Sequence, residues 1–495
     1  MLQTPLFIES GLDDALGAAF CAATASELRR NEGITLTPEW LVDRMVERAA
    51  LAGAFDTVVD AGAGSGRFCI AAARRWPQAR IVAVERSTAM LELLRSNLHL
   101  KNLTHRVTVV EGDFRSVELL AQGRTLFIGN PPFVRHHDIE PDWKAWYGRG
   151  MQALGIRASQ LAGLHAHFML RIVQSMKPGD QLCLVAAAEW LDNGYGSALR
   201  SLLTVSTVNV RGLWVAPPDE AVFPDALVSA AVFEARCAEP EGLVELGLLS
   251  DRKLVASRRI SPSSLAQAVR WTELCQTAPP PSDEGIEVGE LFRVVRGQVT
   301  GLNDAWILPS AIASAEQTGD DLPLLGLALP AVTRAREIID GTVESDTAPL
   351  RLRRVLNLPH ELDTLDPALR AQVDTFLRRA FESGAAAGYV ARQRRHWHAL
   401  DLRPAPAAFV SYMGRRPPVF RTNPHGVTYL NIAHGLYPRA SISAPQLQRV
   451  LDHLNASTGL YSGRVYGGGL AKFEPSDVAR LRIPAQALTE VEPSV

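Results

Sequence analysis

The chain has 495 residues, 47% of them hydrophobic, which is enough for about two or three domains with cores of their own. Its 51 Lys and Arg almost balance its 53 Asp and Glu, so a surface for a polyanion must come from local separation of charge. The five cysteines lack metal-ligand spacing, and the sequence shows neither a basic leader nor an apolar run of about 18 residues. We therefore expect a cytoplasmic protein with no bound metal and no membrane association.

The first half of the chain alternates short β-branched runs with segments of helical spacing, such as 87–100 and 167–176. Strands that are apolar on both faces and separated by helices are typical of a doubly wound α/β fold with a mainly parallel sheet. Such a sheet usually binds its ligand at the carboxyl ends of the strands. The predicted strands are 56–62, 80–85, 106–113, 125–130, 181–188, 208–215 and 227–235.

A change in composition divides the chain near residue 280. Residues 276–285, QTAPPPSDEG, have the proline, serine and acidic content of a linker. Beyond them, the alternation of strands and helices gives way to an irregular sequence rich in arginine and proline. We therefore predict one domain over 1–275 and a second domain of a different kind over 286–495.

A glycine loop follows the first predicted strand. In DAGAGSGRF, Gly62, Gly64 and Gly66 precede a helix, and glycines here make the tight turn and let the backbone approach a ligand closely. The dinucleotide fingerprint G-x-G-x-x-G is not met, because the third glycine comes one residue early. The second strand ends in Glu85 and Arg86, and a carboxylate there can accept both hydroxyl groups of a ribose. These features favour a nucleoside-like ligand over the alternative, a plain tight turn beside an exposed acid.

The third predicted strand also ends in an acid followed by an aromatic residue, Asp113 and Phe114. A carboxylate at this place can accept a hydrogen bond from an adenine, and a ring beside it can cover the base. The alternative reading of the glycine loop becomes weaker with this second acidic strand end.

The fourth predicted strand ends in Asn130, Pro131, Pro132 and Phe133. The Asn130 side-chain oxygen and the Pro131 carbonyl are both acceptors, and the two prolines fix the backbone so that both can point at one small donor group. This pair suits an aryl or amide NH2, because two accepted hydrogen bonds favour a more tetrahedral nitrogen and direct its lone pair at an electrophile. Phe133 then covers a planar substrate, which contributes about 1 to 3 kcal/mol for a nucleobase. The alternative is a turn built from common turn residues.

In chain order, DAGAGSG, VE, GDF and NPPF resemble motifs I to IV of the class I S-adenosylmethionine-dependent methyltransferases, in particular the adenine-N6 DNA methyltransferases of restriction-modification systems. NEGITLTPEWLVDRM, at 31–45, is similar to their motif X. Motif X before motif I, with a recognition domain after the catalytic one, is the order of the TaqI-like gamma class. The resemblance covers nearly the whole chain. The usual NPPY is NPPF here, which loses a hydroxyl group and keeps the ring.

This resemblance implies a fold and a set of site residues. The fold is a seven-stranded Rossmann-like methyltransferase sheet, with motif I at 58–67 and motif IV at 130–133, followed by a mixed α+β target-recognition domain. Phe168 matches the aromatic residue that packs on the cofactor adenine, and Phe223 the one that contacts the flipped target base. The implied cofactor-binding residues are Thr35, Thr37, Asp60, Gly62, Gly64, Glu85, Arg86, Asp113, Phe114 and Phe168, and the implied catalytic residues are Asn130, Pro131, Pro132 and Phe133.

The implied activity is transfer of the methyl group of S-adenosylmethionine to N6 of an adenine swung out of duplex DNA, without a metal ion. The implied partners are double-stranded DNA, bound by a monomer, and a separately encoded restriction endonuclease, because motif X begins near residue 31 and the specificity-like region runs to the last residue. Two alternatives stay open: an N-methyltransferase that acts on RNA or on a glutamine amide of a protein, and a catalytically inactive DNA-binding subunit.

The segment 392–421 is the candidate for DNA contact in the second domain. It holds seven arginines and a single acid, Asp401, with Trp397, Tyr412 and Phe420 between them. Positive charge interleaved with aromatic rings suits phosphate contact and groove readout, and a solvated basic face is the alternative. The candidate DNA-binding arginines are Arg392, Arg394, Arg395, Arg415, Arg416 and Arg421.

Overall fold

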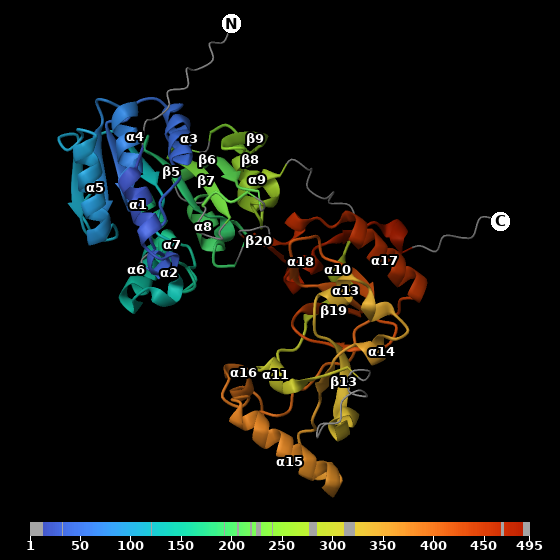
Figure 1. Ribbon diagram of the computed structural model, residues 1–495. Helices are drawn as coiled ribbons and strands as arrows, with labels where there is room; N and C mark the ends of the chain where they lie inside the picture. Colours follow the sequence, from blue (N-terminus) through green and yellow to red (C-terminus); the bar gives the residue numbers. More distant parts are fainter. Residues whose placement is uncertain are drawn as a thin grey trace. The chain divides into compact units, whose positions relative to one another are not determined.

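The computed structural model divides into two compact units, one made of Met1–Pro280 with Tyr466–Gly469 and the other of Pro281–Val465 with Leu470–Val495 (Figure 1). The expected linker, 276–285, lies almost wholly outside the described residues. Within the described part of the chain, no helix is both long and apolar enough to cross a membrane. The structure describes residues 13–31, 33–119, 121–192, 194–204, 207–217, 220–223, 229–239, 241–276, 285–310, 322–466 and 470–488.

The first unit is built around one large sheet. Its strands are β1 Thr57–Ala61, β2 Arg80–Glu85, β3 Val107–Glu111, β4 Thr125–Gly129, β5 Gln181–Ala187, β6 Val208–Val215, β7 Ala230–Cys237, β8 Val244–Ser250 and β9 Lys253–Ile260. Among the described residues, the sheet has nine strands in the order β3-β2-β1-β4-β5-β7-β6-β8-β9. The strands from β3 to β5 are parallel, β7 is antiparallel to both of its neighbours, and β8 and β9 form an antiparallel pair at the far edge.

Helices cover both faces of this sheet (Figure 1). They are α1 Ala15–Ala23, α2 Ser26–Asn31, α3 Glu39–Ala50, α4 Arg67–Arg75, α5 Thr88–Leu100, α6 Pro141–Ala153, α7 Leu164–Ser175, α8 Ser197–Leu202 and α9 Pro262–Gln267. Successive strand residues point to opposite faces, so Val58 belongs to a core with α3, α4 and α5, whereas Val59 belongs to a core with α6, α7 and α8. Two layers of helices around a sheet make a doubly wound α/β fold.

The amphipathic spacing of α3 shows why the layers form. Its buried residues recur with the period of a helix, and Pro38 precedes the first turn, where a missing N–H costs nothing. The buried residues of α3 are Leu41, Val42, Met45, Val46 and Ala49.

All seven predicted strands are present, with bounds within three residues of the prediction. The sequence does not predict β8 and β9, which extend the sheet beyond the seven. In β9 most side chains are partly or fully exposed, so this edge strand lacks the apolar run by which a buried strand is recognised.

The order of the strands reverses between β1 and β4, because the chain adds β2 and β3 on one side of β1 and then β4 and β5 on the other. A reversal of this kind opens a crevice outside the carboxyl ends of the two central strands, where ligands bind in open α/β sheets. The glycine loop follows β1, and the Asn130 segment follows β4. The topology therefore brings both predicted motifs to this crevice.

From residue 285 on, the chain forms four small sheets within the described residues, in the orders β10-β22, β11-β19-β15-β17, β12-β14-β13-β18 and β16-β21-β20. Helices α15 and α17 each pack on one of these sheets, which gives the expected mixed α+β architecture. The elements are β10 Ile286–Glu287, α10 Val288–Leu291, β11 Phe292–Arg296, α11 Asn303–Trp306, β12 Ile307–Leu308, β13 Ala328–Val332, α13 Arg336–Ile339, α14 Ala348–Arg351, β14 Arg354–Leu356, α15 Pro367–Glu382, α16 Tyr389–Arg392, β15 Ala408–Ser411, β16 Met413–Gly414, β17 Phe420–Thr422, β18 Thr428–Tyr429, β19 Ala433–Pro438, α17 Ala444–Ser457, β20 Arg464–Tyr466, β21 Leu470–Lys472, α18 Pro475–Ala479 and β22 Arg482–Ile483.

Candidate active site

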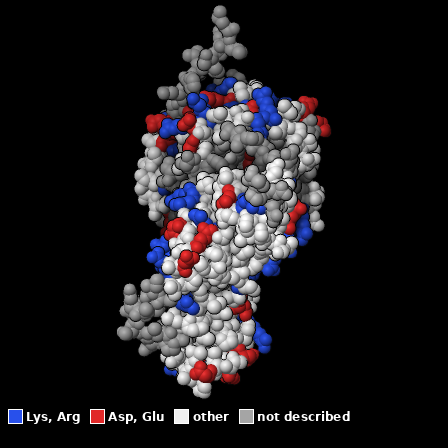
Figure 2. Space-filling view, turned by 90° about the vertical axis from the view of Figure 1, so that its right-hand side faces the viewer, with Lys and Arg blue, Asp and Glu red and all other residues white. Residues whose placement is uncertain are grey.

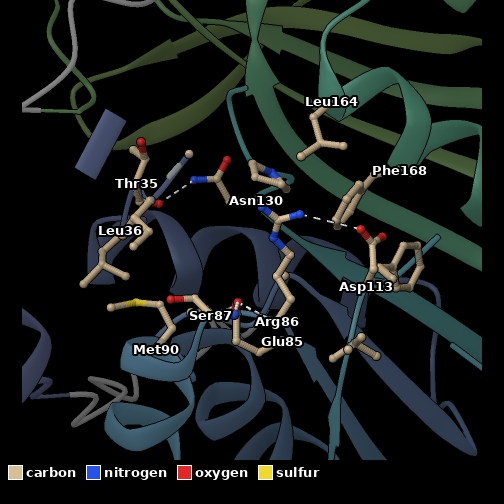
Figure 3. A pocket seen from close by; sticks show the side chains of 18 residues that line it. Thr35, Leu36, Glu85, Arg86, Ser87, Met90, Asp113, Asn130, Leu164 and Phe168 are labelled. Carbon is tan, nitrogen blue, oxygen red and sulfur yellow. Dashed lines mark hydrogen bonds and ion pairs between the residues drawn. The ribbon is translucent and has the colours of Figure 1, made fainter. Parts of the chain in front are cut away.

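The loop between β1 and α4 forms one wall of a cavity at the carboxyl ends of the parallel strands (Figure 3). Gly62, Gly64 and Gly66 have φ angles of +78°, +55° and +92°, a region in which other residues are strained. A Cβ on Gly66 would lie 2.5 Å from Leu94 Cδ1, so this position also lacks space for a side chain. Gly62 and Gly64 line the cavity, whereas Gly66 directly precedes α4.

A buried carboxylate from outside the sheet supports this loop. Asp14, only 2% exposed, accepts hydrogen bonds from Ser65 Oγ at 2.5 Å, Arg67 Nε at 2.8 Å and Asn97 Nδ2 at 2.8 Å. Burial alone would raise the pKa of Asp14, but the hydrogen bonds from Ser65 and Arg67 hold it below its usual range. The sequence gives no signal for Asp14, because its partner Ser65 lies 51 residues further along the chain.

Glu85, at the end of β2, is fixed by backbone N–H groups. Its Oε2 accepts a hydrogen bond from Gly64 N, and its Oε1 accepts from the N atoms of Arg86 and Ser87, all at 2.8 Å. An ionised carboxylate has about four lone-pair positions. Three accepted bonds therefore leave capacity for a further donor in the cavity, such as a ribose hydroxyl.

Asp113, which follows β3, is held by an arginine that the sequence does not single out. Arg115 donates its backbone N and its Nε to Asp113 Oδ1, both at 2.9 Å, and its Nη2 to Oδ2 at 2.6 Å. Arg86 Nη1 lies 3.7 Å from Oδ2, and a dashed line in Figure 3 marks this ion pair. Burial would raise the pKa of Asp113, but the bonds from Arg115 lower it, so this carboxyl group is ionised at neutral pH.

Two stacked aromatic rings complete this end of the cavity. The rings of Phe114 and Phe168 have centroids 5.0 Å apart and an interplanar angle of 27°. Phe168 Cε1 would lie 3.6 Å from a Cβ placed on Gly62, so the ring lies against the glycine loop. Both rings line the cavity and offer apolar surface for a planar base beside the Asp113 carboxylate.

The Asn130 side chain projects into the cavity from the end of β4 (Figure 3). Its Nδ2 donates to the carbonyl oxygen of Thr35 at 3.0 Å, which fixes the orientation of the amide. Its Oδ1 is buried and has no hydrogen-bond partner. A buried acceptor without a partner costs about 1 to 3 kcal/mol, and such a group is expected where a donor on a ligand completes the site.

The residues after Asn130 differ in their positions. Pro132 lines the cavity, whereas Pro131 and Phe133 do not. The Phe133 ring packs edge-to-face on Phe223, with centroids 6.2 Å apart and an interplanar angle of 70°. The structure thus brings together the two rings for which the sequence predicts contact with a substrate base.

Two predicted cofactor residues, Asp60 and Thr37, do not line the cavity. Asp60 is 1% exposed, and its Oδ2 accepts a hydrogen bond from Cys69 Sγ at 3.1 Å, whereas its Oδ1 has no partner. Burial, with a smaller contribution from Glu85, raises the pKa of Asp60 to about 7, although the bond from Cys69 opposes the rise. Thr37 supports the glycine loop, because its carbonyl oxygen accepts from Arg67 Nη1 at 2.6 Å.

Eighteen residues line the cavity. Besides Asn130 and Pro132, the predicted residues among them are Thr35, Gly62, Gly64, Glu85, Arg86, Asp113, Phe114 and Phe168. The sequence does not indicate the others, although most adjoin predicted ones along the chain: Gly33, Ile34, Leu36, Val84, Ser87, Met90, Gly112 and Leu164. In the part of the chain that the structure describes, no group of three or more His, Cys, Asp or Glu residues could hold a metal ion.

The six arginines predicted to bind DNA fall into two groups. Arg394 Nη2 donates to the Val299 carbonyl oxygen at 2.6 Å, and Arg421 Nη1 pairs with Glu344 Oε2 at 3.4 Å, so both connect segments of their own unit. Burial lowers the pKa of Arg394. The remaining four are exposed: Arg392, Arg395, Arg415 and Arg416.

An exposed aromatic ring accompanies these arginines. Tyr389, at the start of α16, is 76% exposed and precedes Arg392 by three residues. The predicted basic segment begins at Arg392 and so does not include it. On the face drawn in Figure 2, basic and acidic side chains are interspersed, in keeping with the near balance of charge in the sequence.

Known proteins resemble both halves of the chain. Residues 281–494 match the family described as Type II methyltransferase M.Eco57I, C-terminal domain, and residues 39–139 match the TRM5/TYW2 methyltransferase domain. The Type II methyltransferase M.XamI of Xanthomonas campestris pv. amaranthicola is 40% identical over 92% of this chain and 85% of its own length. M.AccI of Acinetobacter calcoaceticus is 20% identical over 74% of this chain and 72% of its own length. A release factor glutamine methyltransferase of Geobacter sulfurreducens is 35% identical, but over only 28% of this chain and 45% of its own length.

A solved structure shows the same fold over most of the chain. The Type IIL restriction-modification enzyme MmeI, in complex with DNA, is 13% identical and has a TM-score of 0.63, covering 94% of this chain and 70% of its own. At this identity the likeness shows the fold alone. The identity and coverage shared with M.XamI go further: the chain belongs to the Type II DNA methyltransferases of restriction-modification systems, a family of enzymes for which S-adenosylmethionine is the implied methyl donor.

Proposed function

We propose that this chain transfers the methyl group of S-adenosylmethionine to N6 of an adenine in duplex DNA. The observation that carries the proposal is the Asn130 amide, whose Nδ2 is fixed by the Thr35 carbonyl and whose Oδ1 is buried without a partner. An oxygen held in this way is suited to accept a hydrogen bond from an exocyclic amino group. The carbonyl of Pro131, the next residue, is the second acceptor of the proposed pair.

The cavity residues fit the proposed cofactor. Glu85 keeps acceptor capacity for the ribose, Asp113 is an ionised acceptor for the adenine amino group, and the rings of Phe114 and Phe168 offer apolar surface for the base. When bound, S-adenosylmethionine supplies an electrophilic methyl group on a sulfonium centre. The task of the protein is therefore mainly to position the acceptor nitrogen in line with that group.

The target base has to leave the duplex to reach the end of β4, at a cost of a few kcal/mol. We propose that the paired rings of Phe133 and Phe223 separate or shift to cover this base, which recovers part of that cost. The acceptor pair then holds both N–H bonds of the amino group and directs the lone pair of the nitrogen.

An amino group at C4 of cytosine would meet the same acceptors, so the choice of base rests on a second feature. The motif here begins with Asn130, as in the adenine-N6 enzymes that the sequence resembles. This likeness favours adenine. The match to the release factor methyltransferase of Geobacter sulfurreducens covers only 28% of this chain, so it gives no comparable support to a protein substrate.

The test is to incubate the purified protein with tritiated S-adenosylmethionine and duplex DNA and then to digest the DNA to nucleosides. The expected product is N6-methyladenine. Label in N4-methylcytosine, or label that enters only RNA or release factor in parallel reactions, would overturn the proposal. Asn130→Ala should lower kcat by about 100-fold or more, as loss of one oriented catalytic group does in other enzymes, while binding of DNA is retained.

The second unit is the proposed DNA-recognition domain. The exposed side chains of Tyr389, Arg392, Arg395, Arg415 and Arg416 are the proposed contacts with DNA. As a modification enzyme, the protein would act in the cytoplasm and protect sites that a separately encoded restriction endonuclease cuts.

A further inference from the structure

Arg115 directly follows two residues of the cavity lining, Asp113 and Phe114, and its own side chain is buried. Its side chain is 2% exposed, and three of its nitrogen atoms bind the two oxygens of Asp113. On the other side, the Trp143 ring covers the guanidinium, with its centroid 3.9 Å from the guanidinium carbon. Arg115 Nη1 has no hydrogen-bond partner, so the side chain is committed to one carboxylate and one ring.

A series of ring contacts fixes Trp143 in turn. Trp143 packs edge-to-face on Trp146, at 5.7 Å between centroids, and Trp146 lies 6.0 Å from His167 with an interplanar angle of 29°. His167 also stacks on Tyr147, at 4.7 Å and 12°. His167 directly precedes Phe168, whose ring lines the cavity. The packing of α6 and α7 therefore holds Arg115 in one position.

We propose that Arg115 is a positioning residue that makes the site select the adenine base of the cofactor. By binding both oxygens of Asp113, it prevents rotation of the carboxylate and leaves the free lone pairs directed at the cavity. A fixed acceptor favours a base with an amino group at position 6 and repels a base with a carbonyl oxygen there. This inference rests on the proposed function, since it assumes that an adenine nucleoside occupies the cavity.

A bidentate carboxylate contact is specific to the planar guanidinium. Lysine can supply the charge, but it cannot hold both oxygens at once. Arg115→Lys should therefore keep part of the cofactor affinity and lose much of the discrimination between bases, and Arg115→Met should lose both. A purely electrostatic role for Arg115 would make the lysine variant behave like the wild type.

The experiment compares binding of S-adenosyl-L-homocysteine and S-inosyl-L-homocysteine by titration calorimetry of the full chain. The inosyl compound has a carbonyl oxygen in place of the amino group. The wild type should prefer the adenosyl compound by about tenfold or more, because the wrong base leaves a buried polar group unpaired. Arg115→Met should bind the adenosyl compound about tenfold more weakly and reduce the preference toward one. The matched control is Arg95→Met. Arg95 also pairs with a carboxylate, that of Glu111 at the end of β3, but this ion pair is exposed.

The outcomes separate the two proposals. If the wild type binds neither compound, the cofactor assignment fails and this inference fails with it. If the wild type prefers the adenosyl compound, but the folded variants Arg115→Met and Arg115→Lys prefer it as strongly as the wild type does, only the role of Arg115 is overturned. Thermal unfolding of each variant shows whether it is folded, and the ratio of the two affinities is a readout that a loss of stability alone would not change.

Discussion

The buried carboxyl group of Asp60 should make the stability of the protein fall as the pH rises from about 4 to about 7. Burial raises its pKa from 3.8 to about 7, so the folded state holds a proton that the unfolded state releases. The stabilisation from this group is complete below pH 3.8 and is lost as the pH approaches 7. A pKa that is higher by about 3 in the folded state changes the free energy of unfolding by about 4 kcal/mol, at about 1.4 kcal/mol for each pH unit. No discount for solvent screening applies, because Asp60 is 1% exposed.

Asp60→Asn removes this titration, and urea denaturation between pH 4 and pH 8 without cofactor measures it. The free energy of unfolding of the variant, relative to that of the wild type, should rise by about 4 kcal/mol from pH 4 to pH 7 and then become constant. Cys69→Ala removes the donor whose hydrogen bond lowers the pKa of Asp60, so it should extend the decline to higher pH. A difference between Asp60→Asn and wild type that is the same at every pH would refute the reasoning.

Two further predictions concern His167 and the arginines. Burial lowers the pKa of His167 to about 3, so the unfolded chain gains a proton below about pH 6.5 that the folded chain does not. From pH 6.5 to pH 5, the free energy of unfolding of the wild type should fall by about 2 kcal/mol more than that of His167→Phe, a variant that keeps a ring stacked on Tyr147. Urea denaturation measures both, and equal losses would contradict this prediction. Arg416→Ala should reduce the salt dependence of DNA affinity by a slope of about 1 in fluorescence anisotropy. Arg394→Ala, which removes an internal contact with Val299, should instead lower the melting temperature. If Arg394→Ala changed the salt dependence and Arg416→Ala the melting temperature, the two assignments would be wrong.

The residues at the strand ends were predictable because topology and not side-chain detail brings them together. Once a parallel sheet is recognised, Gly62, Glu85, Asp113 and Asn130 must meet at one edge, since each follows a strand of that sheet. The positions of these residues after the predicted strands are sufficient for this inference, without any knowledge of side-chain packing. The division near residue 280 is predicted on a different basis, the change in composition there.

Residues that act through tertiary contacts could not be predicted in this way. Asp14, the residue before α1, supports the glycine loop from a segment that shares no sequence pattern with it, and Arg115 becomes significant only when Trp143 covers it. Likewise, Arg394 and Arg416 belong to the same basic segment, yet one binds backbone carbonyls and the other is exposed. The sequence gives the number of arginines in this segment, but only the folded structure distinguishes the exposed ones from those with internal contacts.

The hydrogen bond from Asn130 to the Thr35 carbonyl joins two segments that are 95 residues apart. Residues 33–38 precede α3 and belong to no strand of the sheet. Their position along the chain could therefore change without any change in the order of the strands. A circular permutant that carries residues 13–50 at the other end of the first unit should rebuild the same amide orientation, provided that the new connection is long enough. A deletion of residues 13–50 should release the Asn130 amide and also destabilise the first unit, because it removes the buried residues of α3 and the Asp14 carboxylate.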